Sequence, residues 1–176
     1  MANNCWYEIH VKGRREDCET FLERMQGNEV NNFNFCRIFS VYSTISGADD
    51  GEYVLILAGD CAWSLESCCR SSGYAGIDLF EANTRELSLQ MEAYAEETGV
   101  GFMEHYIYDN GACVEDECAD YHEWFWDRGC YETYEEFIAS LGYSKEDCEA
   151  RGVPKEDEFD SEGYCRIGGM EWDFSF

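Results

Sequence analysis

The sequence predicts an α+β protein. We expect a ferredoxin-like β-α-β-β-α-β antiparallel sheet, extended by a β-hairpin and followed by a small C-terminal helical appendage. Three observations support this fold class. Several short segments alternate between apolar and polar residues, other segments repeat with helical spacing, and a favoured hairpin pair, Asn110-Gly111, joins two alternating segments. We expect residues 1–127 to form the sheet domain and residues 128–176 an acidic helical appendage with a final strand.

The first half of the sheet domain follows from its periodicity. Residues 5–13, CWYEIHVKG, alternate and predict a half-buried strand. Residues 14–27 carry apolar side chains at i, i+3, i+4 and i+7 and stop at a glycine, which predicts an amphipathic helix. Residues 34–43 and 52–59 are expected to be two strands joined by the turn SGADDG. The second is apolar on both sides and is therefore expected in the middle of the sheet.

The second half begins with a short helix expected over residues 61–73, capped by Asp60. Residues 86–97, ELSLQMEAYAEE, fit a helix in part, but their strict alternation favours a strand. Residues 101–118 follow as a hairpin. A two-residue turn would place Glu104 opposite Glu117, a like-charge pair on an outer face of the sheet.

Two capping boxes mark the helices of the appendage. Thr133 with Glu136 begins one helix, and Ser144 with Asp147 begins the next. A proline follows the second helix, and residues 164–174 are a possible last strand.

Charge is the strongest compositional feature. The 176 residues carry a formal net charge of −26, yet 45% are hydrophobic and 16% aromatic, which indicates a folded chain. Residues 1–80 hold 12 acids and 6 bases, whereas residues 81–176 hold 26 acids and 6 bases. Twelve acids stand between Arg85 and Arg128 without a base. This segregation disfavours direct binding to nucleic acid or membranes and favours a basic protein partner.

The chain shows no export signal, and its longest apolar run, residues 53–59, is too short to cross a bilayer. We therefore expect a cytoplasmic protein. The cysteine count of 11 is odd, which favours reduced thiols over a disulfide scaffold.

Acids and aromatics share the expected outer face of the hairpin and its preceding strand. Carboxylates spaced along strands can occupy the places of phosphates and engage the Lys and Arg side chains that hold a nucleic acid. Aromatic side chains would anchor such a contact. The expected partner-binding residues are Glu86, Glu92, Tyr94, Glu96, Glu104, Tyr106, Glu115, Glu117, Asp120, Glu123, Trp124 and Asp127.

The sequence contains no nucleophile elbow, phosphate-binding glycine loop or His-Glu-x-x-His motif, so we expect neither an enzyme nor a cofactor. One alternative is a zinc-binding accessory protein, with His105, Cys118 and His122 as candidate ligands. Another is a module that binds a host factor unrelated to nucleases.

Three motifs carry a resemblance: NNCWYEIHVKG, AGDCAWSLESCC and EETGVGFMEHYIYDNG. Through them, roughly residues 1–120 resemble small ferredoxin-like proteins encoded by phages and mobile elements of Firmicutes. The resemblance implies an anti-defence role in a bacterial host cell, such as that of a type II-A anti-CRISPR. Such a protein would bind Cas9, with or without guide RNA, and block its DNA binding or cleavage.

Overall fold

The computed structural model describes residues 4–27, 35, 37–48, 51–70, 77–97, 100–125, 133–150, 153, 156, 164–168, 170 and 172–176. The chain forms two compact units. The first unit comprises Met1–Ala119 and Met170–Phe176, and the second comprises Asp120–Gly169.

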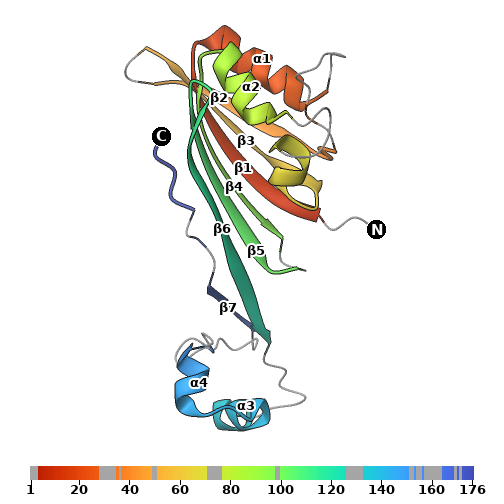
Figure 1. Ribbon diagram of the computed structural model, residues 1–176, viewed down its shortest axis with the longest axis vertical. Helices are drawn as coiled ribbons and strands as arrows, with labels where there is room; N and C mark the ends of the chain where they lie inside the picture. The colour runs from red at the N-terminus through yellow and green to blue at the C-terminus, as the bar shows by residue number, and fades with distance from the viewer. Residues whose placement is uncertain are drawn as a thin grey trace. The chain divides into compact units, whose positions relative to one another are not determined.

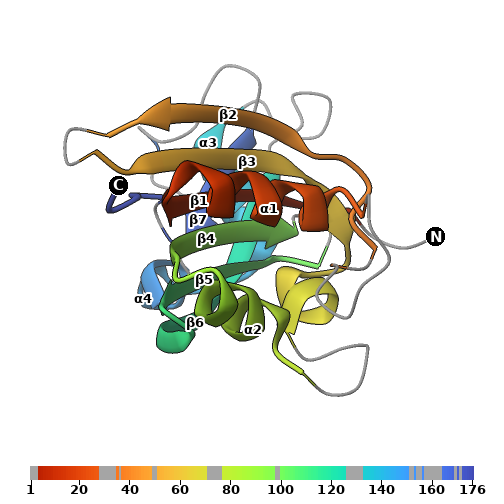
Figure 2. The ribbon, with the colours of Figure 1, turned by 90° about the horizontal axis from the view of Figure 1, so that it is seen from above.

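The first unit has an α+β fold built on an antiparallel sheet (Figure 1). Its six strands lie in the order β2-β3-β1-β4-β5-β6. Their bounds are β1 Asn4–Gly13, β2 Tyr42–Gly47, β3 Tyr53–Ala62, β4 Gln90–Glu97, β5 Phe102–Asp109 and β6 Ala112–Phe125. Helix α1 spans Arg15–Met25, a π-helical turn η1 spans Glu66–Arg70, and helix α2 spans Leu79–Glu86. Both α-helices lie on the same face of the sheet (Figure 2).

The core lies between the sheet and these helices. Strand β1 is central and sends every second side chain, Tyr7, Ile9 and Val11 among them, into the core with no exposed surface. Phe21 of α1 and Phe80 of α2 meet these side chains from the other layer. The alternation predicted for residues 5–13 is therefore confirmed. Each fully buried large apolar side chain stabilises the fold by about 1.5–3 kcal/mol, so these alternate residues determine which face of β1 is inside.

Strand β4 also confirms a sequence prediction. Met91, Ala93 and Ala95 are buried at alternate positions, and β4 pairs antiparallel with both β1 and β5. The strand interpretation of residues 86–97 is therefore correct for Gln90–Glu97, although the first residues of that range end helix α2.

Two predicted elements are wrong in part. Residues 61–73 do not form one helix, because β3 continues to Ala62 and only Glu66–Arg70 forms a turn of π-helix. Of residues 34–43, only the last two belong to β2. Ile38 instead makes an isolated bridge to Cys61.

Helix α2 was not predicted at all. Its buried face includes Asn83 and Thr84, which interrupt the apolar period. Asp78 caps the helix by accepting a hydrogen bond from the backbone N–H of Glu81. Inside the helix, the Asn83 amide donates to the carbonyl of Leu79, so this buried polar group has a hydrogen-bond partner.

The second unit contains α3 Tyr134–Leu141, α4 Lys145–Ala150 and the pairing of the distal part of β6 with β7 Tyr164–Gly168. Both capping boxes are confirmed. The Thr133 hydroxyl accepts from the backbone N–H of Glu136, and the Ser144 hydroxyl accepts from that of Asp147. A small cluster of Phe137, Cys148 and Val153 forms its apolar centre.

No helix in the described part of the chain has the length and apolar character needed to span a membrane.

Candidate functional site

Glu104, expected on the outer face, is buried on the side of the sheet that carries the helices. It is 3% exposed. Its carboxylate accepts hydrogen bonds from the backbone N–H groups of Leu65 (2.8 Å) and Glu66 (3.3 Å) and from the hydroxyl of Tyr106 (2.8 Å). Burial raises the pKa of Glu104, although these donors oppose the shift. Glu104 is therefore a structural residue of the core, and its hydrogen bonds connect β5 to the start of η1.

The expected register of the hairpin is wrong beyond its turn. The register that places Glu104 opposite Glu117 also places Tyr106 opposite Glu115 on the same face. Tyr106 instead packs against Phe80 among the helices, whereas Glu115 lies 3.6 Å from His105 on the opposite face. The side chains of β6 are therefore offset by one residue, as one extra residue in a strand produces. This offset separates Glu104 from Glu117 and removes the predicted like-charge pair.

Glu86, and two acids outside the expected partner-binding set, have internal cations. Glu86 accepts hydrogen bonds from Arg24 at 3.1 and 3.2 Å. Arg70 donates to Asp116 at 2.8 Å and to Asp78 at 3.2 Å. The acids of this region are therefore partly neutralised by the molecule's own arginines.

Glu92 and Tyr94 lie on the face of the sheet opposite α1 and α2, here called the open face, together with His10, Met103 and His105. Glu92 is 1% exposed and Tyr94 is 5% exposed. Their burial has an unexpected source, because Met170 and residues 172–176, which belong to the first unit, lie against this face (Figure 1).

Aromatic rings and hydrogen bonds hold the C-terminal segment, residues 172–176, on the open face. The ring of Phe174 stacks on His10 with centroids 3.6 Å apart, and Trp172 stacks on Tyr94 at 5.8 Å. The backbone N–H of Ser175 donates to a carboxylate oxygen of Glu92 at 2.7 Å. Burial and the nearby carboxylates raise the pKa of Tyr94.

His105 stands at the edge of this covered region. Its ring stacks on Tyr94 with centroids 4.0 Å apart and an interplanar angle of 12°. Its Nε2 atom lies 2.9 Å from a carboxylate oxygen of Glu92, and its Nδ1 atom faces Glu115. Ligand atoms of His105, Glu115 and Glu117 all lie within 4.8 Å of one another. Sequence analysis missed this group because the offset in β6 brings Glu115 and Glu117 to the face of His105.

The other predicted ligands are differently placed. Cys118 is exposed, and its neighbour in the strand, Glu117, is the residue that joins His105. The side chain of His122 lies outside the described residues, as do those of Asp120, Glu123 and Trp124 and the whole of Asp127. Glu96 is half-buried on β4.

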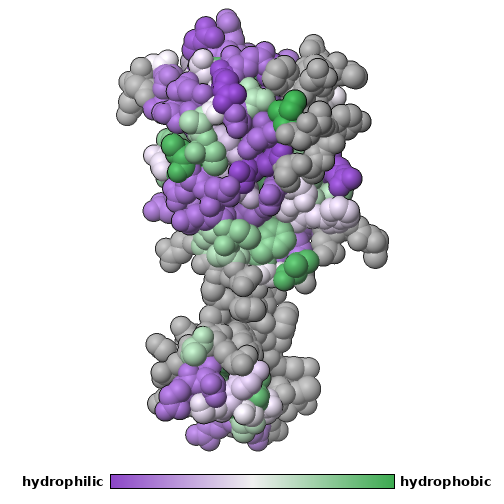
Figure 3. Space-filling view, in the orientation of Figure 1, coloured by the Kyte–Doolittle hydropathy of each residue, from purple (hydrophilic) through white to green (hydrophobic). Residues whose placement is uncertain are grey.

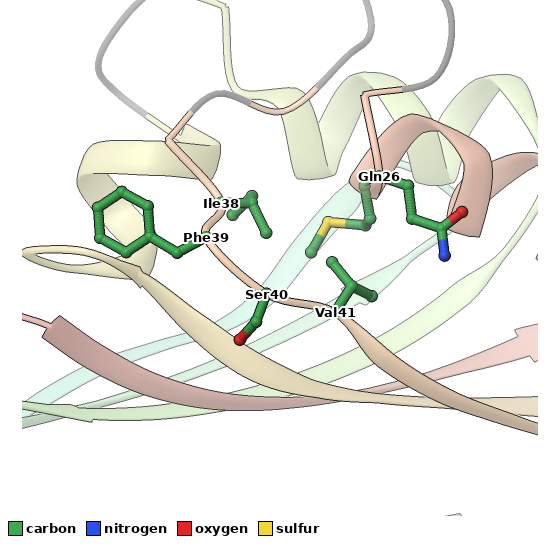
Figure 4. Close-up of a pocket in the computed structure, with 6 residues that line it drawn as sticks. Gln26, Ile38, Phe39, Ser40 and Val41 are labelled. Atoms are coloured by element: carbon green, nitrogen blue, oxygen red, sulfur yellow. The ribbon is translucent and has the colours of Figure 1, made fainter.

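A small hollow lies on the helix side of the sheet, lined by Met25, Gln26 and residues 38–41 (Figure 4). Its volume is about 170 Å³, below the roughly 300–1,000 Å³ of ordinary ligand pockets. None of its lining side chains is titratable, so we do not assign it a ligand.

Comparisons of the chain with protein-family models, with curated proteins and with solved structures found no match.

Proposed function

We propose that the protein is a non-enzymatic inhibitor whose exposed carboxylates bind a basic, nucleic-acid-binding surface of another protein. One observation carries this proposal: cations of the first unit are engaged by carboxylates of the same unit and leave a large acidic surplus uncompensated. The internal pairs are Lys12 with Glu52, Arg14 with Asp17, Arg15 with Glu19, Arg24 with Glu86, Arg70 with Asp78 and Asp116, and Arg85 with Glu81.

Both units carry the surplus. The first unit contains 24 acids and 7 bases, a net charge of −17, and the second contains 14 acids and 5 bases, a net charge of −9. These values recover the total of −26. The visible face of the first unit is mainly hydrophilic (Figure 3). Self-repulsion of this size costs stability, and a partner that supplies positive charges would relieve it.

The structure changes which acids enter the proposal. Buried Glu104 and Glu92 do not reach a partner surface in this conformation. Exposed acids remain on both units, among them Glu117 on β6, Glu135 on α3 and Glu146 on α4. These three are the carboxylates that we assign to partner binding.

Cas9, with or without its guide RNA, is the first partner to test. The resemblance of three motifs to mobile-element proteins implies an anti-defence role, and the channel and PAM-reading arginines of Cas9 are basic. We also assign the first four strands to a ferredoxin-like core that β5 and β6 extend. The support is the chain order β1-α1-β2-β3-α2-β4, with β1 lying between β3 and β4.

A binding and cleavage assay tests the proposal. Immobilised Cas9, alone and loaded with guide RNA, should bind the protein with a Kd that rises steeply with salt, and DNA cleavage should fall as the protein is added. The variants Glu117→Lys and Glu135→Lys/Glu146→Lys should each weaken binding by on the order of tenfold.

A matched charge reversal at another site distinguishes binding through specific residues from attraction by the overall negative charge. Glu16→Lys/Glu23→Lys changes two exposed acids of α1 and should affect the Kd much less than Glu135→Lys/Glu146→Lys. Failure of the protein to bind either form of Cas9 at low salt would remove Cas9 as partner. Equal weakening by all variants would remove the assigned surface.

A further inference from the structure

A histidine and two glutamates from neighbouring strands converge beside the C-terminal segment. His105 lies on β5, and Glu115 and Glu117 lie on β6, with one ligand atom from each residue within 4.8 Å of the others. We propose that these three side chains bind one divalent transition-metal ion and that Glu92 orients the imidazole from behind. Glu117 is also one of the carboxylates assigned to partner binding, but metal binding is measured on this chain alone, so the metal site is tested separately from the proposed inhibitory function.

The buried imidazole points to a ligand on its Nδ1 side. His105 is 7% exposed, and its Nε2 atom is hydrogen-bonded to Glu92 at 2.9 Å. Its Nδ1 atom is 3.6 Å from Glu115, longer than a hydrogen bond, and makes no hydrogen bond within the part of the chain that the structure describes. Because Nε2 is turned toward Glu92, Nδ1 is the ring nitrogen that faces the glutamates of β6.

The groups behind the imidazole are fixed before any ion arrives. One carboxylate oxygen of Glu92 accepts from the backbone N–H of Ser175, so the other oxygen is held toward His105. The ring of Tyr94 stacks on a face of the imidazole and sets the plane of the ring. Histidine ligands usually donate their second ring N–H to a carboxylate in this way, which fixes the tautomer and raises the basicity of the coordinating nitrogen.

The charge around His105 also favours a cation. Glu92, Glu115 and Glu117 surround one imidazole, and no lysine or arginine among the described residues pairs with any of the three. A divalent ion would offset the repulsion between the two carboxylates of β6.

The ligand set defines the class of ion. One imidazole nitrogen with two carboxylates suits Mn²⁺, Fe²⁺ or Zn²⁺ better than Cu⁺, which prefers sulfur, or Ca²⁺, which prefers oxygen alone. Mn²⁺ is the sharpest probe for this chain, because the exposed thiols of Cys113 and Cys118 would compete for softer ions.

Titration of the chelator-treated full chain with Mn²⁺, followed by the electron paramagnetic resonance signal of the free ion, tests the site. One ion should bind per chain. Glu115→Gln/Glu117→Gln should weaken binding by at least about tenfold, and so should His105→Gln. The glutamate variant alters partly or fully exposed side chains, so it keeps the test valid if the buried His105→Gln variant fails to fold.

Two controls isolate the cause. Glu16→Gln/Glu23→Gln removes the same charge from α1, and Cys113→Ser/Cys118→Ser removes the exposed thiols of β6. Both should retain the Mn²⁺ affinity of the natural chain. The proposal is overturned if the natural chain does not bind one Mn²⁺ saturably, if Glu115→Gln/Glu117→Gln binds as tightly, or if the α1 control loses as much affinity.

Discussion

The backbone N–H of Ser175 donates a 2.7 Å hydrogen bond to Oε2 of Glu92. The other carboxylate oxygen of Glu92 contacts His105, so both oxygens of a nearly fully buried acid have a partner. A buried carboxylate without such partners is costly. The C-terminal segment therefore completes the open face of the sheet.

Removal of residues 172–176 should destabilise the first unit. The deletion breaks the Ser175–Glu92 hydrogen bond and the aromatic contacts of Trp172 and Phe174. We expect the free energy of unfolding to fall by about 2–4 kcal/mol, measured by urea denaturation.

An aromatic residue elsewhere provides the control for the deletion. Phe39→Ala removes a ring that is 56% exposed and should change the stability by less than about 0.5 kcal/mol. A deletion as harmless as Phe39→Ala would contradict the packing of the segment on the open face.

Local periodicity and capping chemistry predicted part of this fold well. The alternation in β1 and β4 and the capping boxes of α3 and α4 are local signals, and the structure confirms them. Helix α2 was missed because buried Asn83 takes its partners from Leu79 and Arg24, and an amide at a core position breaks the apolar period. Such a polar core position becomes visible only when the tertiary partners are known.

The candidate site could not be predicted for two physical reasons. A one-residue offset in β6 exchanges the faces of that strand, so Glu115 and Glu117 lie beside His105. The C-terminal segment carried a signal, since Trp172, Phe174 and Phe176 alternate with polar residues and favour an extended strip with one aromatic side. Its docking surface depends on long-range contacts that periodicity does not encode.

Substitution of Glu104 should destabilise the core even though Gln has nearly the same shape. Both oxygens of Glu104 accept hydrogen bonds, from Leu65 on one side and from Glu66 and Tyr106 on the other. The amide of Gln has a single acceptor oxygen, so its NH₂ group would face a donor. We expect Glu104→Gln to lower the free energy of unfolding by about 1–3 kcal/mol.

An exposed glutamate is the matched control for Glu104→Gln. Glu117→Gln makes the same chemical change on the surface of β6 and should alter stability by no more than about 0.5 kcal/mol. Urea denaturation of both variants at neutral pH measures the difference. Equal effects would contradict the structural role of Glu104.

The same carboxyl should leave a signature in the pH dependence of stability. Burial raises the pKa of Glu104 above its ordinary value of 4.5, so the folded state holds this proton to a higher pH than the unfolded chain. The proton-linked part of the stabilisation from this group is fully present below pH 4.5 and is lost as the pH rises through the raised pKa, whereas the hydrogen bonds that its oxygens accept remain. The stability difference between the natural chain and Glu104→Gln should therefore shrink across this interval. A difference that grows would mean that the hydrogen-bond donors outweigh burial.

Arg70 should be the most stabilising of the paired surface arginines. Its guanidinium lies between Asp78 and Asp116 and stacks over the ring of Tyr106 at 4.4 Å from the centroid. Asp78 also caps α2 and accepts a hydrogen bond from Tyr108 at 2.5 Å. Loss of the Arg70 cation would leave this half-buried carboxylate, at the start of α2, without its positive partner.

We expect Arg70→Met to lower the free energy of unfolding by about 1–3 kcal/mol, and Arg70→Lys to recover only part of the loss, because an ammonium group cannot bridge two carboxylates while stacking on a ring. Arg15→Met breaks the exposed pair with Glu19 and should cost much less than Arg70→Met. If urea denaturation showed that Arg70→Lys keeps the full stability of the natural chain, Arg70 would stabilise the fold through its charge alone. Arg15 forms an exposed ion pair without burial or stacking. Equal losses of stability in Arg70→Met and Arg15→Met would therefore show that the burial and stacking of Arg70 add nothing.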